Sequence, residues 1–360
     1  MMRPTGPWTC RVHAVIRLTI SFLLGLSLSA CTADPPEDRL QDYEERLFRT
    51  LGITEVDSLV PQYPRFPAPR YLRIDSSREA IDILDLWSLR ECALHGVLAE
   101  RNSSLGRVAR PSTRMFYELD FLRLAPACID LLLQSGKEEL AATLGDALAD
   151  KEARLPAVIW QGVLGGAEYR HYWKSPQRLG DYPHATSYAS DQALQALASD
   201  VRRWLAHDYR FERAEVEAAL QKIHGGDGGA LYKSVVLQAV YLERIDAAVQ
   251  QRLQAGPVCR SGKDSRASIL DTVVRKFFVG RIQPWSVRLQ TRAYQIEPAR
   301  DLEELLAGAE PEAFGRWREQ RDRLMAKGLR APRAHVEALL PVMRQCGLAP
   351  QAQAKVPGHI

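Results

Sequence analysis

Apolar side chains recur at three- and four-residue steps along most of the chain, which is the spacing of an amphipathic helix. Residues 229–254 carry the longest stripe, formed by Leu231, Val235, Ala239, Leu242, Val249 and Leu253. No segment alternates in the way a strand does, and no internal repeat of fixed period is found. We therefore expect an all-α fold, a multi-helix globular body with helices over residues 37–51, 79–100, 112–134, 137–150, 155–165, 190–206, 211–223, 229–254, 266–279, 284–294, 299–307, 310–327 and 332–345.

Four stretches interrupt the helical pattern and predict long irregular connections. Residues 61–74 contain four prolines, which favour an extended segment lying across the surface. Residues 165–189 are aperiodic, and residues 347–360 predict a frayed, flexible tail. The glycine-rich run 224–229 predicts a hinge between an N-terminal and a C-terminal helical half. Pro126 is expected to kink or interrupt its helix.

The N-terminus combines three arginines with an apolar core over Leu18–Leu28, and no acidic residue precedes Cys31. This core is too short for a membrane span, which takes about 20 residues, and is typical of a cleaved secretory signal. The run Leu28-Ser29-Ala30-Cys31 resembles a bacterial lipoprotein signal, so we expect residues 1–30 to be removed and Cys31 to be lipidated. An ordinary signal cleaved after Ala30 and an uncleaved transmembrane helix are the alternatives.

The lipoprotein signal also predicts where the protein resides. The resemblance implies three acyl chains on Cys31, whereas one chain alone binds a membrane only marginally. Thr32 follows Cys31, and by analogy with enterobacterial sorting this favours the periplasmic face of the outer membrane, with the inner membrane as the alternative. Residues 31–36 would form a short lipidated tether, and residues 37–346 an all-α periplasmic domain.

Charge and motifs exclude several classes of function. The chain has 48 basic and 44 acidic residues, and three of the basic ones lie in the predicted signal, which leaves 45 against 44. A nearly neutral body has no global electrostatic footprint for nucleic acid, so we expect no nucleic-acid partner. The sequence also lacks a nucleophile elbow, a zinc-protease helix, a phosphate loop and a dinucleotide fingerprint, so no cofactor is indicated.

Four cysteines follow Cys31, and an even number in an oxidising compartment favours disulfides. We expect the pairs Cys92–Cys128 and Cys259–Cys346, because each joins segments predicted to be consecutive or nearby helices. Other pairings and buried free thiols are the alternatives. A metal site is disfavoured, because no two cysteines have the Cys-x-x-Cys spacing.

The run from Glu100 to Gly106 is the densest polar segment beside an apolar helix. As a catalytic site, it would use Glu100 as the acid or base and Arg101 and Asn102 to position a polar ligand, with Ser103 as a further binding candidate. As a structural element, it would be a helix C-terminus and a loop in which Asn and Gly satisfy the backbone geometry. We favour the structural interpretation.

Residues 169–188 gather aromatic, Arg and His side chains in a connection of functional length, since loops beyond about 12–15 residues often carry function. Such side chains stack on sugars or on a partner protein. The binding candidates are Tyr169, His171, Trp173 and His184. The alternative, which we favour, is a long crossover packed down by its own aromatics. The two histidines are too loosely spaced to indicate a metal.

No acidic residue lies between Thr272 and Ile296, where basic side chains are interleaved with aromatic ones. In the periplasm such a segment would meet lipid headgroups, lipopolysaccharide phosphates or cell-wall carboxylates. The binding candidates here are Arg275, Lys276, Arg281 and Trp285. The alternative, which we favour, is a pair of amphipathic helices with solvated arginine faces.

The run Arg101–Gly106, its flanking Cys92 and Cys128 and the lipoprotein signal resemble an uncharacterised family of gammaproteobacterial lipoproteins, known as a domain of unknown function. The resemblance extends over nearly the whole mature chain and implies a lipid-anchored envelope protein without assigned catalytic residues. We therefore expect a non-enzymatic factor that binds an envelope protein or a cell-wall component in assembly or maintenance. The alternative is a hydrolase or lyase acting on the cell wall or on lipids, with Glu100 as acid or base.

Overall fold

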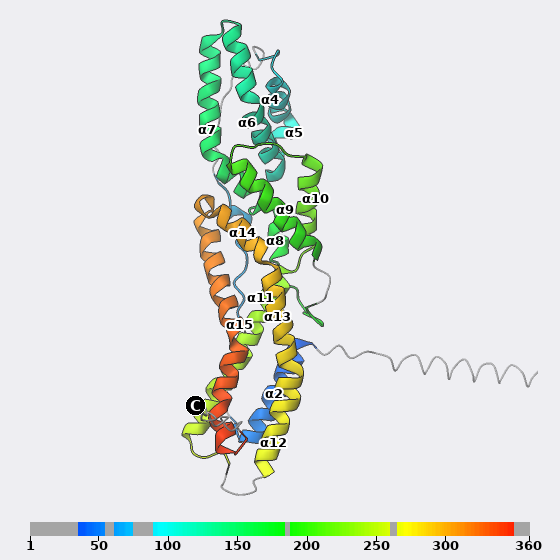
Figure 1. Cartoon of the computed structure of the whole chain (residues 1–360), viewed down its shortest axis with the longest axis vertical. Helices are drawn as coiled ribbons and strands as arrows, with labels where there is room; N and C mark the ends of the chain where they lie inside the picture. The colour runs from blue at the N-terminus through cyan, green and yellow to red at the C-terminus, as the bar shows by residue number, and fades with distance from the viewer. Residues whose placement is uncertain (1–34, 55–60, 75–88, 184–187, 260–264, 349–360) are drawn as a thin grey trace, which may run out of the picture.

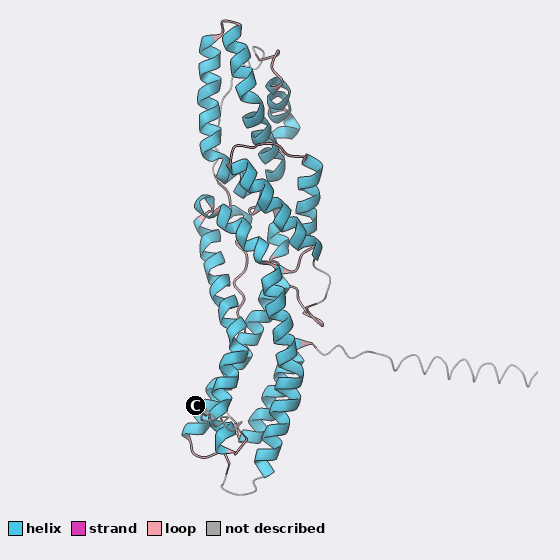
Figure 2. Ribbon diagram, in the orientation of Figure 1, coloured by secondary structure: helices cyan, strands magenta, loops and turns pink. Residues whose placement is uncertain are grey.

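A computed structural model describes residues 35–54, 61–74, 89–183, 188–259 and 265–348, and every regular element in these ranges is helical (Figures 1 and 2). The predicted all-α class is therefore confirmed. The predicted lipidation site Cys31, the binding candidate His184 and most of the predicted tail lie outside the described residues.

The helices follow the apolar stripes of the sequence, and Pro36 and Pro111 begin two of them at the position where a missing N–H is tolerated. The α-helices are α2 (Pro36–Leu51), α4 (Leu94–Asn102), α5 (Ser104–Arg107), α6 (Pro111–Gln134), α7 (Glu138–Val163), α8 (Ala167–Tyr172), α9 (Tyr188–Leu205), α10 (Arg213–His224), α11 (Gly228–Gln254), α12 (Ser265–Val273), α13 (Gln283–Gln295), α14 (Glu297–Leu305) and α15 (Glu312–Gln345). Short 3₁₀ turns are η1 (Pro69–Tyr71) and η3 (Ala307–Ala309), and η2 (Val274–Ile282) is a π-helix.

The molecule is elongated, with different helices at its two ends (Figure 1). A hairpin of α6 and α7 forms one end, together with α4 and α5. At the other end α2 and α12 pack beside the long helices α11 and α15. The helices α8, α9, α10 and α14 fill the middle, so the connection between α7 and α9 crosses the centre of the molecule.

Several helices are longer than their predicted ranges. The ranges 137–150 and 155–165 are parts of α7, which continues through Pro156, and 310–327 and 332–345 are parts of α15. The predicted break at residues 328–331 was wrong, because α15 is continuous there and crosses α11 at this point. A Cβ atom on Gly328 would lie 2.2 Å from the carbonyl oxygen of Val235, so this glycine allows α15 to cross close to α11. It marks a helix crossing and not a helix end.

Three further expectations need correction. Pro126 does not interrupt α6; it is exposed, where water can bond the carbonyl that the proline leaves unpaired. The helix predicted over residues 79–100 begins only at Leu94 in the described part, because residues 89–93 form turns. The aperiodic stretch 165–189 contains a short helix, α8, whose Tyr169 and Tyr172 are buried.

The segments α12, η2 and α13 form one continuous helical rod from Ser265 to Gln295 (Figure 1). The π-helical part lies in its middle, where Phe277 and Phe278 pack inward. The aromatic ring of Tyr43 on α2 lies 5.7 Å from that of Phe278. The wider π turn therefore lies where the rod packs against α2.

Polar contacts also hold α2 to the helices beside it. The Tyr43 hydroxyl and the Nε2 atom of His335 lie 2.7 Å apart, and His335 also bonds Asp246 through Nδ1. The Arg244 guanidinium donates hydrogen bonds to the Glu44 carboxylate. These contacts connect α2 to α11 and α15.

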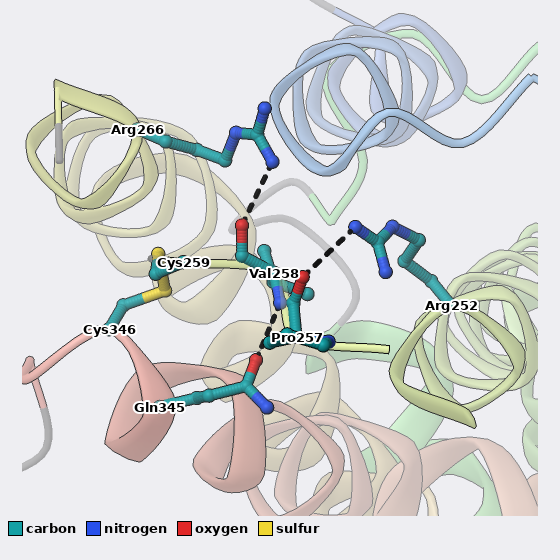
Figure 3. Close-up of a disulfide and its surroundings, with 7 residues drawn as sticks. All are labelled: Arg252, Pro257, Val258, Cys259, Arg266, Gln345 and Cys346. Atoms are coloured by element: carbon teal, nitrogen blue, oxygen red, sulfur yellow. Dashed lines mark hydrogen bonds between the residues drawn. A yellow bond between two sulfur atoms is a disulfide. The ribbon is translucent and has the colours of Figure 1, made fainter. Parts of the chain in front are cut away.

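Both predicted disulfides are confirmed. The Cys92–Cys128 bond ties the turn before α4 to α6, and the Cys259–Cys346 bond ties the chain after α11 to the end of α15. Figure 3 shows the second bond and its surroundings. The backbone N–H of Val258 donates to Gln345 Oε1 at 2.7 Å, and Arg266 Nη1 donates to the Val258 carbonyl at 2.8 Å. Hydrogen bonds from both neighbouring helices therefore hold the chain beside the disulfide in place.

Within the described ranges, no helix combines the length and apolar character needed to cross a membrane.

Candidate functional site

An open hollow of about 880 Å³ lies between the extended segment 61–66 and the chain from α8 to Gln177; we call it the basic groove. The segment 61–66 is held in place by aromatic contacts, since the Phe66 ring lies 4.7 Å from that of Trp317. The Nε1 atom of Trp317 donates to the Pro64 carbonyl at 3.4 Å. The groove is lined by Pro61, Tyr63, Pro64, Arg65, Phe66, Ala167, Arg170, His171, Trp173, Lys174, Ser175, Pro176, Gln177, His224 and Lys233.

The lining of the basic groove contains four permanent cations and two histidines but no carboxylate. Three of the cations, Arg65, Arg170 and Lys174, form no side-chain hydrogen bond or ion pair with any residue in the described ranges. Most other basic side chains in the described ranges are paired with an acid, as Arg39 is with Asp181 at 2.7 Å. An excess of unpaired cations in a hollow attracts an anion. Carboxylates and phosphates are the groups that guanidinium and ammonium groups bind best.

The two histidines of the groove stack on one another, with the ring centroids of His171 and His224 3.9 Å apart. Partial burial lowers the pKa of His171, and the neighbouring His224 and Lys174 lower it further. The ring is therefore neutral at pH 7, and a bound anion would favour its protonated form. No group of three or more His, Cys, Asp or Glu side chains in the described part of the chain is arranged to hold a metal ion.

Trp173, which lines the groove, packs against a buried aromatic and ionic cluster. The Arg321 guanidinium lies 4.3 Å from the centroid of the Trp173 ring and forms two hydrogen bonds of 2.6 Å with Glu303. The hydroxyl of Tyr169 donates to the same carboxylate. Burial, with Glu303 as the next cause, raises the pKa of Tyr169 well above its usual range, so the hydroxyl stays protonated. This cluster fixes the position of Trp173.

One edge of the groove lies beside the first turn of α2. The Lys233 ammonium donates to the carbonyls of Pro176 and Gln177, at 3.1 and 2.8 Å, and lies 4.0 Å from a carboxylate oxygen of Glu37. Burial raises the pKa of Tyr63 to about 12, with Glu37 as the next cause. The Tyr63 hydroxyl is therefore available as a hydrogen-bond donor.

The glycine-rich run 224–229 joins α10 to α11, and its first residue, His224, lines the groove. A Cβ atom on Gly229 would lie 2.3 Å from the Lys174 carbonyl oxygen, so only glycine allows this approach. Asp227 bonds Arg292 at 2.6 Å and accepts from the hydroxyl of Tyr182 at 2.9 Å. The run is thus packed against its surroundings, and the hinge expected there stays a prediction.

The structure separates the sequence candidates of 169–188 into two groups. His171 is exposed and Trp173 is buried, and both line the groove. Tyr169 is buried beneath it and is unavailable to a ligand. The favoured interpretation, a crossover packed by its own aromatics, describes Tyr169 and Tyr172 well, since their rings stack 5.8 Å apart.

The run from Glu100 to Gly106 lies on α4 and α5, and none of its residues lines the groove. Glu100 accepts a hydrogen bond from Tyr117 at 3.0 Å and lies 3.7 Å from Arg213. Arg101 pairs with Glu118, and the exposed Asn102 ends α4. The Ser103 hydroxyl donates to the Glu100 carbonyl and accepts from the Gly106 N–H, as an N-cap of α5 does. These contacts match the structural interpretation of the run.

The basic candidates near residue 280 lie on the rod of α12, η2 and α13. Arg275 pairs with Asp271, Lys276 is exposed, and Arg281 pairs with Asp42 on α2. Trp285 is fully buried, and its Nε1 donates to the Tyr182 carbonyl at 2.9 Å, so it contacts the core and not a partner. Arg292 is likewise buried, between Asp191 and Asp227.

The comparisons with known proteins identify a family but no activity. The family model described as "Protein of unknown function (DUF3080)" matches residues 40–350. No curated protein and no solved structure matches this chain.

Proposed function

The chain belongs to the DUF3080 family of proteins of unknown function, and we propose that it is a lipid-anchored envelope protein that binds an anionic ligand in the basic groove. In this proposal residues 1–30 are cleaved, and Cys31 holds the folded body at the periplasmic face of the outer membrane of a gammaproteobacterium. The protein acts by binding and not by catalysis.

The observation that carries this proposal is the acid-free lining of the groove with its three unpaired cations. Charge-assisted hydrogen bonds contribute about 1.5–3 kcal/mol each, so Arg65, Arg170 and Lys174 would supply most of the affinity for an anion. The aromatic walls formed by Tyr63, Phe66 and Trp173 would contact an apolar part of the same ligand. By contrast, the exposed Glu100 lies outside the groove, which gives the hydrolase alternative no support.

Titration calorimetry with pyrophosphate tests the proposal. We expect the mature protein to bind this probe and the variant Arg65→Gln, Arg170→Gln, Lys174→Gln to lose at least tenfold in affinity, since each lost charged contact is worth that much. A matched control, Arg275→Gln, Lys276→Gln, Arg288→Gln, removes the same charge from the rod and should bind as the wild type does. Equal loss in both triple variants would show a global charge effect and contradict the proposal.

The predicted anchor needs a separate measurement. Mass spectrometry of the mature protein should find Cys31 as the first residue with covalently attached acyl chains. An unmodified Cys31, or a chain that retains residues 1–30, would remove the envelope part of the proposal.

A further inference from the structure

The basic groove lies close, along the chain, to the predicted anchor. Lys233, which lines the groove, is 4.0 Å from Glu37 in the first turn of α2. Glu37 is only six positions after Cys31 in the chain. At about 3.3–3.6 Å per residue, this stretch spans about 20 Å when fully extended. A lipidated Cys31 therefore keeps this edge of the groove within about 20 Å of the membrane surface.

We propose that the anionic group bound in the basic groove is the phosphate of an anionic lipid headgroup, in the same membrane that holds Cys31. This inference rests on the proposed function and names the ligand class of that site. The groove can approach the headgroup layer without a change in the fold, because Lys233 at the groove edge lies beside Glu37, which is only six positions after Cys31 in the chain.

The chemistry of the groove fits a lipid phosphate. Two guanidinium groups and an ammonium group match a phosphate, and the protonated Tyr63 hydroxyl adds a neutral donor. The apolar walls, which include Phe66 and Pro64, suit the glycerol and upper acyl region of a lipid. A strongly hydrated free anion would use the cations alone, so the aromatic walls favour the lipid as the source of the phosphate.

Photo-crosslinking in vesicles tests this assignment. The full mature lipidated protein would carry a photoreactive residue at the exposed, groove-lining position Gln177, and the vesicles would contain phosphatidylcholine with increasing phosphatidylglycerol. We expect a phosphatidylglycerol adduct whose yield rises to half its maximum at a certain fraction of phosphatidylglycerol in the vesicles. For Lys174→Gln this fraction should be about fivefold higher than for the wild type, since each cation near a charged membrane surface changes the affinity by about that factor. The control Lys276→Gln should leave the half-saturation point unchanged. A photoreactive residue at Leu133, at the far end of α6, should form no adduct (Figure 1).

The possible outcomes separate this inference from the proposed function. The assignment to an anionic lipid phosphate is overturned if the yield of lipid adduct is the same in vesicles of pure phosphatidylcholine. It is also overturned if Lys174→Gln leaves the half-saturation point unchanged. Soluble glycerol phosphate should reduce the yield of the lipid adduct only at high concentration. If it abolishes the adduct at concentrations near the dissociation constant of pyrophosphate, the groove binds a free anion, and the assignment to a lipid is overturned. If pyrophosphate binds the groove but no lipid adduct forms, the inference fails while the proposed function stands.

Discussion

Replacing Arg321 by methionine should strongly destabilise the protein, because a carboxylate would remain in the core without its cation. The side chains of Arg321 and Glu303 are only 1% and 2% exposed. Removing one partner of a buried ion pair costs about 3–5 kcal/mol, since the remaining charge keeps its desolvation penalty. We expect the free energy of unfolding of Arg321→Met to fall by about that amount in urea denaturation at pH 7. The exposed pair Arg316–Glu312 on the same helix is the control, and Arg316→Met should change stability by about 0–1 kcal/mol.

A double variant shows whether charge is the cause. Glu303→Gln keeps an oxygen that accepts from Tyr169 and removes the charge, so Glu303→Gln with Arg321→Met should be more stable than Arg321→Met alone. The reasoning is refuted if Arg321→Met costs less than about 1 kcal/mol or if the double variant recovers nothing. In that case Arg321 would stabilise through its packing on Trp173 and Trp317, at 4.3 and 4.8 Å.

Two other predictions concern stability. The Cys259–Cys346 disulfide closes a loop with a sequence separation of 87, for which loop entropy predicts a stabilisation of about 4.6 kcal/mol. Cys346→Ser should therefore lower the urea concentration at the midpoint of unfolding, and an unchanged midpoint contradicts this prediction. Gly229→Ala should destabilise by about 2 kcal/mol or more in thermal unfolding, because the new Cβ meets the Lys174 backbone; Gly308→Ala, with open space around it, is the control.

The all-α class and most helices could be predicted because they depend on the local spacing of apolar residues. Both disulfides could be predicted from the even number of cysteines and the nearness of the helices that carry them. Its errors arose where tertiary contacts override local signals. The break predicted between residues 327 and 332 falls where Gly328 lets α15 cross α11, and the binding candidate Trp285 is a core residue. An aromatic residue among arginines has the same sequence pattern whether its helix face is buried or exposed. For Trp285, the packing of α13 against α11 and α15 decides that.

The candidate site was predictable only in part. His171 and Trp173 were singled out because their segment is long and aromatic, and both line the groove. Two of the cations come from distant segments: Arg65 from a proline-rich stretch and Lys233 from the second turn of α11. Single cations of this kind carry no motif. What makes them a site is their convergence without a carboxylate, which appears only when the chain is folded.

The attachment of α2 determines how this protein would bear mechanical load. If the chain is held at its N-terminal side, any tension enters through α2. It then reaches Tyr43 and His335, whose contact spans 292 positions, and Glu44 and Arg244, whose contact spans 200. Tension at the beginning of the chain would therefore pass into α11 and α15 before it reached the α6–α7 hairpin. Under such tension the end of the molecule that carries that hairpin would bear no load, and its surface would keep its shape.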